Sequence, residues 1–114
     1  MKETDQLLDS LVMEMRRGMV ILGVLSRLSI SQYGYSLIKT LEKEGFNVEP
    51  GTLYPLLRRL EKQGLLESSW DTSENRPRKY YLLSTKGLVV YEQLRDEWHK
   101  LAKSIATLID HEMG

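Results

Sequence analysis

Apolar residues at helical spacing dominate the first quarter of the chain. From Thr4 or Asp5 to Leu28 they recur every three or four residues, at Leu8, Leu11, Met15, Met19, Leu22 and Leu25. This spacing places them along one side of a helix and predicts a single amphipathic helix over the range. Gly18 and Gly23 lie inside it, and each weakens a helix by about 1 kcal/mol relative to alanine. We therefore expect the two glycines to permit close packing against another element.

Two shorter helices are predicted next. The first spans Gln32–Glu44, with Ser31 as its N-cap, and the second begins at Pro50 or Gly51 and ends at Gln63. A glycine follows each end, as is common where a helix terminates.

The helix that ends at Gln63 has two contrasting sides. At about 100° per residue, its leucines fall together on one side. They are Leu53, Leu56, Leu57 and Leu60. The opposite side carries Gly51, Pro55, Arg58 and Lys62, with Thr52 and Arg59 beside them. The leucines therefore predict a buried face, and the cations predict an outward basic face.

After residue 64 the period changes from that of a helix to that of a strand. Leu65–Trp70 and Lys79–Leu83 are rich in aromatic and apolar residues, and the polar segment Asp71–Arg78 lies between them. This pattern predicts a β-hairpin with a long basic tip.

A last helix is predicted from Thr85 to Glu112, capped by Ser84. Its apolar residues step by three and four and form a heptad seam. They are Tyr91, Leu94, Trp98, Leu101, Ile105 and Leu108. So narrow a stripe on a long helix is typical of packing on another helix. We expect that helix to be the same one, or the first helix, of a second copy.

Composition narrows the class of protein. With 114 residues, 41% of them hydrophobic and 28% charged, the chain fits one globular unit, and the lack of cysteine excludes disulfides and thiolate metal sites. The longest apolar run, Met19–Leu25, is too short to span a bilayer, and the acidic start lacks a signal-peptide core. We expect a cytoplasmic protein with no membrane partner.

Charge and motifs point away from enzymes. The formal net charge is zero, yet residues 15–40 hold four basic side chains and no acidic one, whereas residues 1–14 hold four acidic ones. The chain has no GxSxG motif, no glycine-rich phosphate loop and no metal-ligand spacing. We predict that it is not an enzyme and that it binds no cofactor and no metal.

The order of elements predicts a mainly α fold with a small β-hairpin, a winged helix-turn-helix with long N- and C-terminal dimerisation helices. Residues 1–84, including the first helix at 4–28, would form the DNA-binding domain. Residues 85–114 would form the dimerisation helix, and the two would make one compact unit. The predicted helix that ends at Gln63 would fit the B-DNA major groove, which is about 12 Å wide and accepts one helix.

Double-stranded DNA is therefore the predicted partner. The predicted contacts are Tyr33, Tyr35, Lys39, Gly51, Thr52, Tyr54, Pro55, Arg58, Arg59, Arg76, Arg78 and Lys79. Simpler explanations remain open for several of them. The helix cations could form an ordinary solvated face, the hairpin cations could prevent edge pairing, and the tyrosines could be packing residues. A winged helix that binds another protein instead of DNA is the alternative function.

A homodimer is the second predicted partner. The predicted interface consists of Leu8, Leu11, Met15, Tyr91, Leu94, Trp98, Leu101, Ile105 and Leu108. Trp98 and Met15 are also the candidate residues for a small aromatic effector. The alternative for Trp98 is that it only fills the dimer core.

The chain resembles the PadR-like family of bacterial transcriptional regulators. The resemblance rests on Tyr33-Gly34-Tyr35, on the run from Gly51 to Glu61, and on Gly64-Leu65-Leu66, Trp70, Arg78-Lys79-Tyr80-Tyr81, Leu83-Ser84 and Gly87. It implies homodimers on inverted-repeat operators, usually repressors that small molecules release. Trp98 falls where multidrug-binding members with a single C-terminal helix carry a tryptophan at the dimer interface. Leu82 and Pro77 depart from the family pattern, which leaves the reach of the wing open.

Overall fold

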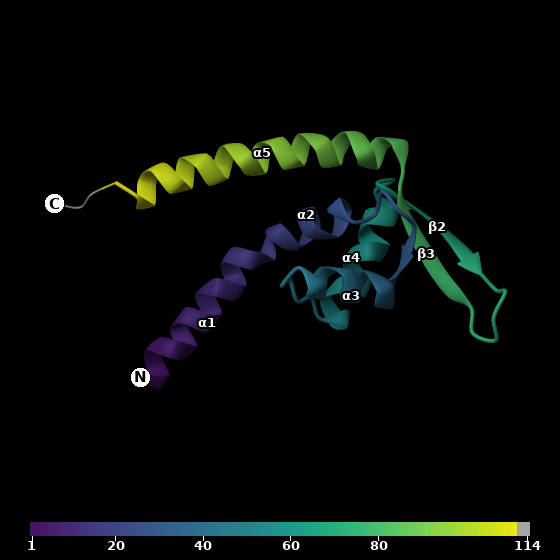
Figure 1. The fold of residues 1–114 in the computed structure, drawn as a ribbon, viewed down its shortest axis with the longest axis horizontal. Helices are drawn as coiled ribbons and strands as arrows, with labels where there is room; N and C mark the ends of the chain where they lie inside the picture. Colours follow the sequence, from purple (N-terminus) through teal and green to yellow (C-terminus); the bar gives the residue numbers. More distant parts are fainter. Residues whose placement is uncertain (112–114) are drawn as a thin grey trace.

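The computed structural model of the chain describes residues 1–111. Its helices are α1 (Lys2–Arg17), α2 (Met19–Ser26), α3 (Gly34–Lys43), α4 (Pro50–Lys62) and α5 (Thr85–Ile109), and its strands are β1 (Gln32–Tyr33), β2 (Leu66–Asp71) and β3 (Arg78–Leu83). In Figure 1, α1 and α5 extend as two long arms toward the chain ends, and the β2–β3 hairpin lies at the far end of the molecule. The last helix ends at Ile109, and its predicted end, Glu112, lies outside the described residues.

The core lies where α2, α3, α4 and the sheet meet. The buried apolar side chains are Val24, Leu25, Leu28, Leu37, Leu41, Val48, Leu53, Leu56, Leu57, Leu60, Leu66 and Tyr81. All four leucines predicted to face inward from α4 are among them, so that prediction is confirmed. Each fully buried leucine stabilises the fold by about 1.5–3 kcal/mol relative to an exposed one. The leucines therefore fix which side of α4 faces outward.

The sheet has three strands, not the two of the predicted hairpin. The strands lie in the order β1-β3-β2, and both neighbouring pairs are antiparallel. Gln32 and Tyr33 pair with Tyr81 and Tyr80 of β3. The prediction of helix from Gln32, capped by Ser31, was therefore wrong, because backbone pairing holds these two residues extended. The helix begins at Gly34.

The hairpin ladder also extends one residue farther toward the tip than predicted on each strand. Asp71 and Arg78, which were assigned to the loop, face each other as the last pair of the β2–β3 ladder. This pairing shortens the tip to residues 72–77 and brings Arg78 onto the sheet.

The predicted first helix is two helices, α1 and α2, and Gly18 lies between them. Glycine has the lowest helix propensity of any residue except proline, so a break at this position is physically reasonable. No residue of α1 is buried, whereas Val24 and Leu25 of α2 belong to the core. The α1 helix is thus an arm that leaves the body of the domain.

Three predicted helix ends are confirmed. Gly45 and Gly64 follow α3 and α4 with φ of 78° and 79°, a left-handed conformation that side-chain-bearing residues rarely adopt. At the start of α5, the Ser84 hydroxyl accepts a hydrogen bond of 2.9 Å from the Gly87 N–H. Within residues 1–111, no helix is long and apolar enough to cross a membrane.

Candidate nucleic-acid interface

The outward side of α4 is basic, and its cations are unpaired among the described residues. Arg58, Arg59 and Lys62 are exposed, and none of them forms an ion pair within residues 1–111. By contrast, Lys39 and Arg78 each lie within 4 Å of a glutamate oxygen. The α4 cations therefore keep their full charge toward solvent, which favours a polyanionic partner.

The first turn of α4 is open to close approach. Pro50 occupies the start of the helix, and a Cβ added at Gly51 would meet no atom within 4 Å. Thr52 and Pro55 are also exposed. The positive end of the helix dipole and a small side-chain profile thus coincide here, as a groove-binding helix requires.

Tyr54 lies on the flank of α4 that faces α3. A Cβ at Gly34 would lie 2.4 Å from Cε1 of the Tyr54 ring, so the ring packs directly on the Gly34 backbone. The ring keeps 39% of its surface exposed. Gly34 therefore permits the close contact that sets the spacing of the two helices, and Tyr54 stays partly exposed.

Four predicted DNA contacts from separate parts of the chain form one row across α3 and the sheet. The Arg78 guanidinium lies 4.7 Å from the Tyr33 ring centre, Tyr33 stacks on Tyr35 at 6.5 Å, and the Lys39 ammonium lies 5.4 Å from the Tyr35 ring centre. Tyr80, which was not predicted as part of a site, packs edge-on against Tyr33 at 5.4 Å. Its alternation with Tyr81 along β3 could have indicated this outer position.

Lys79 is not oriented like its neighbour Arg78. Its ammonium forms a 3.0 Å ion pair with Oε1 of Glu61 on α4, and the Ser68 hydroxyl donates to Oε2 of the same carboxylate. The hydrogen bond from Ser68 and then that from Lys79 lower the pKa of Glu61, and the Glu61 hydrogen bond raises the pKa of Lys79. Glu61, Ser68 and Lys79 form the wing anchor, because they join the hairpin to α4.

The wing tip is ordered by a short turn. The Asp71 carboxylate accepts hydrogen bonds from the Ser73 hydroxyl and N–H at 2.6 and 2.9 Å, and these bonds lower the pKa of Asp71. Arg78 lies 3.8 Å from Glu74, whereas Arg76 is exposed and forms no ion pair within the described part of the chain. Arg76 is therefore the tip cation that is most available to a partner.

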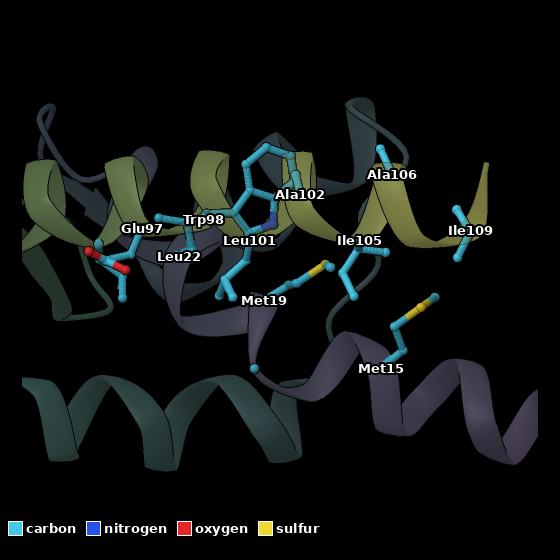
Figure 2. A pocket seen from close by; sticks show the side chains of 12 residues that line it. Met15, Met19, Leu22, Glu97, Trp98, Leu101, Ala102, Ile105, Ala106 and Ile109 are labelled. Carbon is cyan, nitrogen blue, oxygen red and sulfur yellow. The ribbon is translucent and has the colours of Figure 1, made fainter. Parts of the chain in front are cut away.

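A second feature lies on the other side of the molecule, between α1–α2 and α5. It is an apolar groove of about 590 Å³. Figure 2 shows Leu101 and Ile105 pointing from α5 toward the other two helices, while Met15 and Met19 point back toward α5. Trp98 and Glu97 line the same groove. The two predicted effector residues, Met15 and Trp98, are thus brought together.

Most of the predicted dimer residues form exposed apolar surface on these two arms. Leu8, Leu11, Met15, Leu101, Ile105 and Leu108 are each more than half exposed, and Leu94 and Trp98 are 37% exposed. Tyr91 differs, because it is partly buried and packs on the core of its own chain. In a single copy, the seam from Leu94 to Leu108 is therefore only partly covered.

Comparison with known proteins decides the family. The family model described as "Transcriptional regulator PadR-like family" matches residues 21–93, which span α2 to the first third of α5. The chain belongs to the PadR-like family. A PadR-family regulator from Eggerthella lenta has a crystal structure with a TM-score of 0.93 and 42% identity, covering 98% of this chain and 100% of that one. A PadR-like regulator from Bacillus cereus has a TM-score of 0.77 and 33% identity, covering 87% and 99%.

A curated relative agrees with the structural neighbours. Transcriptional regulator Rv3488 of Mycobacterium tuberculosis is 32% identical over 102 residues, which are 89% of this chain and 95% of that protein. This PadR-like protein is a DNA-binding transcriptional regulator and not an enzyme. The winged-helix fold and the family resemblance are both confirmed.

The wing anchor predicts a specific pH dependence of stability. The Glu61 pKa is lowered on folding, so its contribution is present above about pH 4.3, the unfolded value, and is lost as the pH falls through the folded value. The side chains of Glu61 and Lys79 are each about 30% exposed. Solvent screening therefore limits the free energy of unfolding that Glu61→Gln loses to about 0.5–1 kcal/mol at pH 7.

Urea denaturation across pH 3–8 measures this loss. We expect the gap between wild type and Glu61→Gln to close as the pH falls below about 4. Glu67→Gln, a change at an exposed β2 residue with no ion pair in the described chain, is the matched control and should show little gap. A gap that stays constant over the whole range would contradict the charged anchor.

Proposed function

We propose that the protein is a repressor that binds an inverted-repeat duplex as a homodimer, with α4 of each copy in the major groove. The observation that carries this proposal is the side of α4 opposite its four buried leucines, where Arg58, Arg59 and Lys62 form no ion pair with any described residue. Gly51 and Thr52 at the helix start would approach base edges, and the cations would contact phosphates and guanine. Pro55 would lie against the groove wall.

The wing and α3 would hold the sugar–phosphate backbone on either side of α4. Arg76 and Arg78 would contact phosphates from the wing, and the hydroxyls of Tyr33 and Tyr35 would donate to phosphate from α3. Lys39, beside Tyr35, would add charge to the same contact. Lys79 is engaged by Glu61, so its role would be to fix the wing rather than to bind phosphate directly. Tyr54 would contribute the exposed part of its side chain.

The dimer would form through the two arms. A second copy would cover the apolar seam on α5 and the exposed residues Leu8, Leu11 and Met15 of α1. Each leucine or isoleucine buried in this way contributes about 1.5–3 kcal/mol. Residues 1–84 would thus bind DNA, and residues 85–114, of which the last three lie outside the described part, would pair the copies. Because two-fold proteins bind two-fold operators, this pairing supports the proposal of an inverted repeat.

The groove between α1–α2 and α5 would hold a planar aromatic effector stacked on the Trp98 indole, with Met15 against its edge. Glu97 lines the groove and favours a cationic ring. Binding would move α5 relative to α1 and so change the distance between the two α4 helices. Since half-sites lie about 34–36 Å apart, a small change would release the operator.

Repression follows from occupancy, because a dimer bound across an operator excludes other proteins from the same duplex. A regulator of this kind acts where the DNA is, in the cytoplasm of a bacterial cell. The competing hypothesis is a winged helix that binds another protein and not DNA. A gel-shift assay with duplex DNA in moderate salt separates the two.

The double change Arg76→Ala and Arg78→Ala should weaken binding to all duplexes and flatten its salt dependence. Each phosphate contact contributes about 0.9 to the slope of log K against log salt concentration. Arg58→Ala and Thr52→Ala should instead change which sequence is preferred. Arg95→Ala on α5, which removes an exposed cation paired with Asp96, is the control. If the wing variant kept both affinity and slope, the wing would not contact phosphate.

Leu101→Glu should split the dimer and abolish operator binding with it. The change places a charge at a side chain that lines the apolar groove. Val89→Glu is the control, since Val89 is 51% exposed on α5 but lies roughly opposite Trp98 around the helix. Light scattering at micromolar concentration should show a monomer for Leu101→Glu and a dimer for Val89→Glu. A wild-type protein that is monomeric there would refute the dimer.

The effector site is tested by fluorescence in Trp70→Phe, which leaves Trp98 as the only indole. Planar cationic dyes should quench its emission, because stacked rings interact favourably beyond area burial, by about 0.5–1.5 kcal/mol. Glu97→Gln should weaken the binding of cationic dyes and leave the binding of neutral dyes unchanged. Absence of quenching in a protein that light scattering shows to be dimeric would make Trp98 a purely structural residue.

A further inference from the structure

Trp70 is the one tryptophan that the proposed contacts leave without a role. It is the fifth residue of β2, lies opposite Lys79 in the ladder, and keeps 64% of its surface exposed. A large exposed indole is unfavourable in water unless a partner covers it, and tryptophan is enriched where one side of a contact is apolar and the other polar. Its position on the wing therefore indicates a contact surface.

The alternation along β2 fixes the direction in which Trp70 projects. Leu66, Ser68 and Trp70 share one face of the strand. Leu66 on this face is buried in the core, and Ser68 donates to Glu61 of α4. Trp70 thus lies on the side of the wing that faces α4, one step beyond the last residue that α4 covers.

Charge decides what could cover this indole. The neighbouring cation on the same face, Lys79, is bound to Glu61, and Arg58 lies one helical turn before Glu61 on α4 without a carboxylate partner in the described chain. Glu67 and Asp71, the acidic residues of β2, fall on the opposite face of the strand. An exposed apolar ring on the side of the wing that faces basic α4, with the acidic residues of β2 on the other face, fits a surface that combines apolar C–H groups with phosphates.

We propose that Trp70 lies against the sugar–phosphate backbone of the duplex, between the groove that holds α4 and the wing. The indole plane packs on deoxyribose, and its Nε1–H donates to a phosphate oxygen. This inference rests on the proposed function, because it deepens the same interface. The wing anchor holds the hairpin so that the indole reaches the strand as α4 enters the groove. Since deoxyribose carries no sequence information, Trp70 strengthens binding to all duplexes alike.

The test uses the full-length protein and a mixed-sequence 30-base-pair duplex at low salt. Trp70→Ala should lower affinity about tenfold, within the range found for aromatic contacts with nucleic acid. The salt slope should stay unchanged, because the lost contact releases no counterion. Trp70→Phe should recover part of the affinity. Ile30→Ala, at a side chain that is 74% exposed and is not among the proposed DNA contacts, is the control and should bind like wild type.

Fluorescence gives an independent measure. Wild-type emission should change when the duplex is added, and the change should be absent in Trp70→Phe while its complex is still seen by gel shift. If wild type shifts the duplex but Trp70→Ala binds equally well, the inference fails and the proposed function stands. If no variant shifts any duplex, both fail. If Trp70→Ala is monomeric by light scattering where wild type is dimeric, the indole is covered by a second copy, which also overturns the inference.

Discussion

The near-complete burial of Leu53, Leu57 and Leu60 in the core sets the orientation of α4, and the rest of the interface depends on that orientation. Rotation of α4 about its axis would expose leucine and bury cations, at a cost of several kcal/mol for each uncompensated charge. The basic side is therefore fixed outward by the leucines on the other side of the same helix. Arg58 and Lys62 need no partner in this chain, because the packing behind them already holds them in place.

The wing depends on the same helix through a different kind of contact. The Glu61 side chain projects from α4 between the leucines and the cations. It accepts a hydrogen bond from Ser68 and forms an ion pair with Lys79, both on the hairpin. One carboxylate thus connects the helix proposed to enter the groove with the wing proposed to lie beside it. The row of Arg78, Tyr33 and Tyr35 joins the outer face of the sheet to α3 in the same way. The proposed interface thus joins α3, α4 and the sheet, and α1 and α5 extend away from the hairpin (Figure 1).

Local pattern was enough to predict the helices, the hairpin and the two sides of α4, because periodicity, glycine stops and the Ser84 cap act within a few residues. It failed where distant residues decide the outcome. Gln32 and Tyr33 are strand only because β3, nearly fifty residues later, pairs with them. Lys79 was predicted to contact DNA, and the sequence did not show that Glu61, on another element, forms an ion pair with it. The helix also breaks at Gly18. This glycine was noted to weaken a helix, but one continuous helix was still predicted.

The proposed dimer presents two α4 helices to one duplex in a fixed two-fold arrangement. This arrangement can be tested by selecting duplexes that bind the wild-type protein from a random pool. The recovered sequences should contain two copies of one half-site in inverted orientation, with centres about 10–10.5 base pairs, or a multiple of that, apart. Recovery of single half-sites without a partner, or no enrichment over the starting pool, would contradict it.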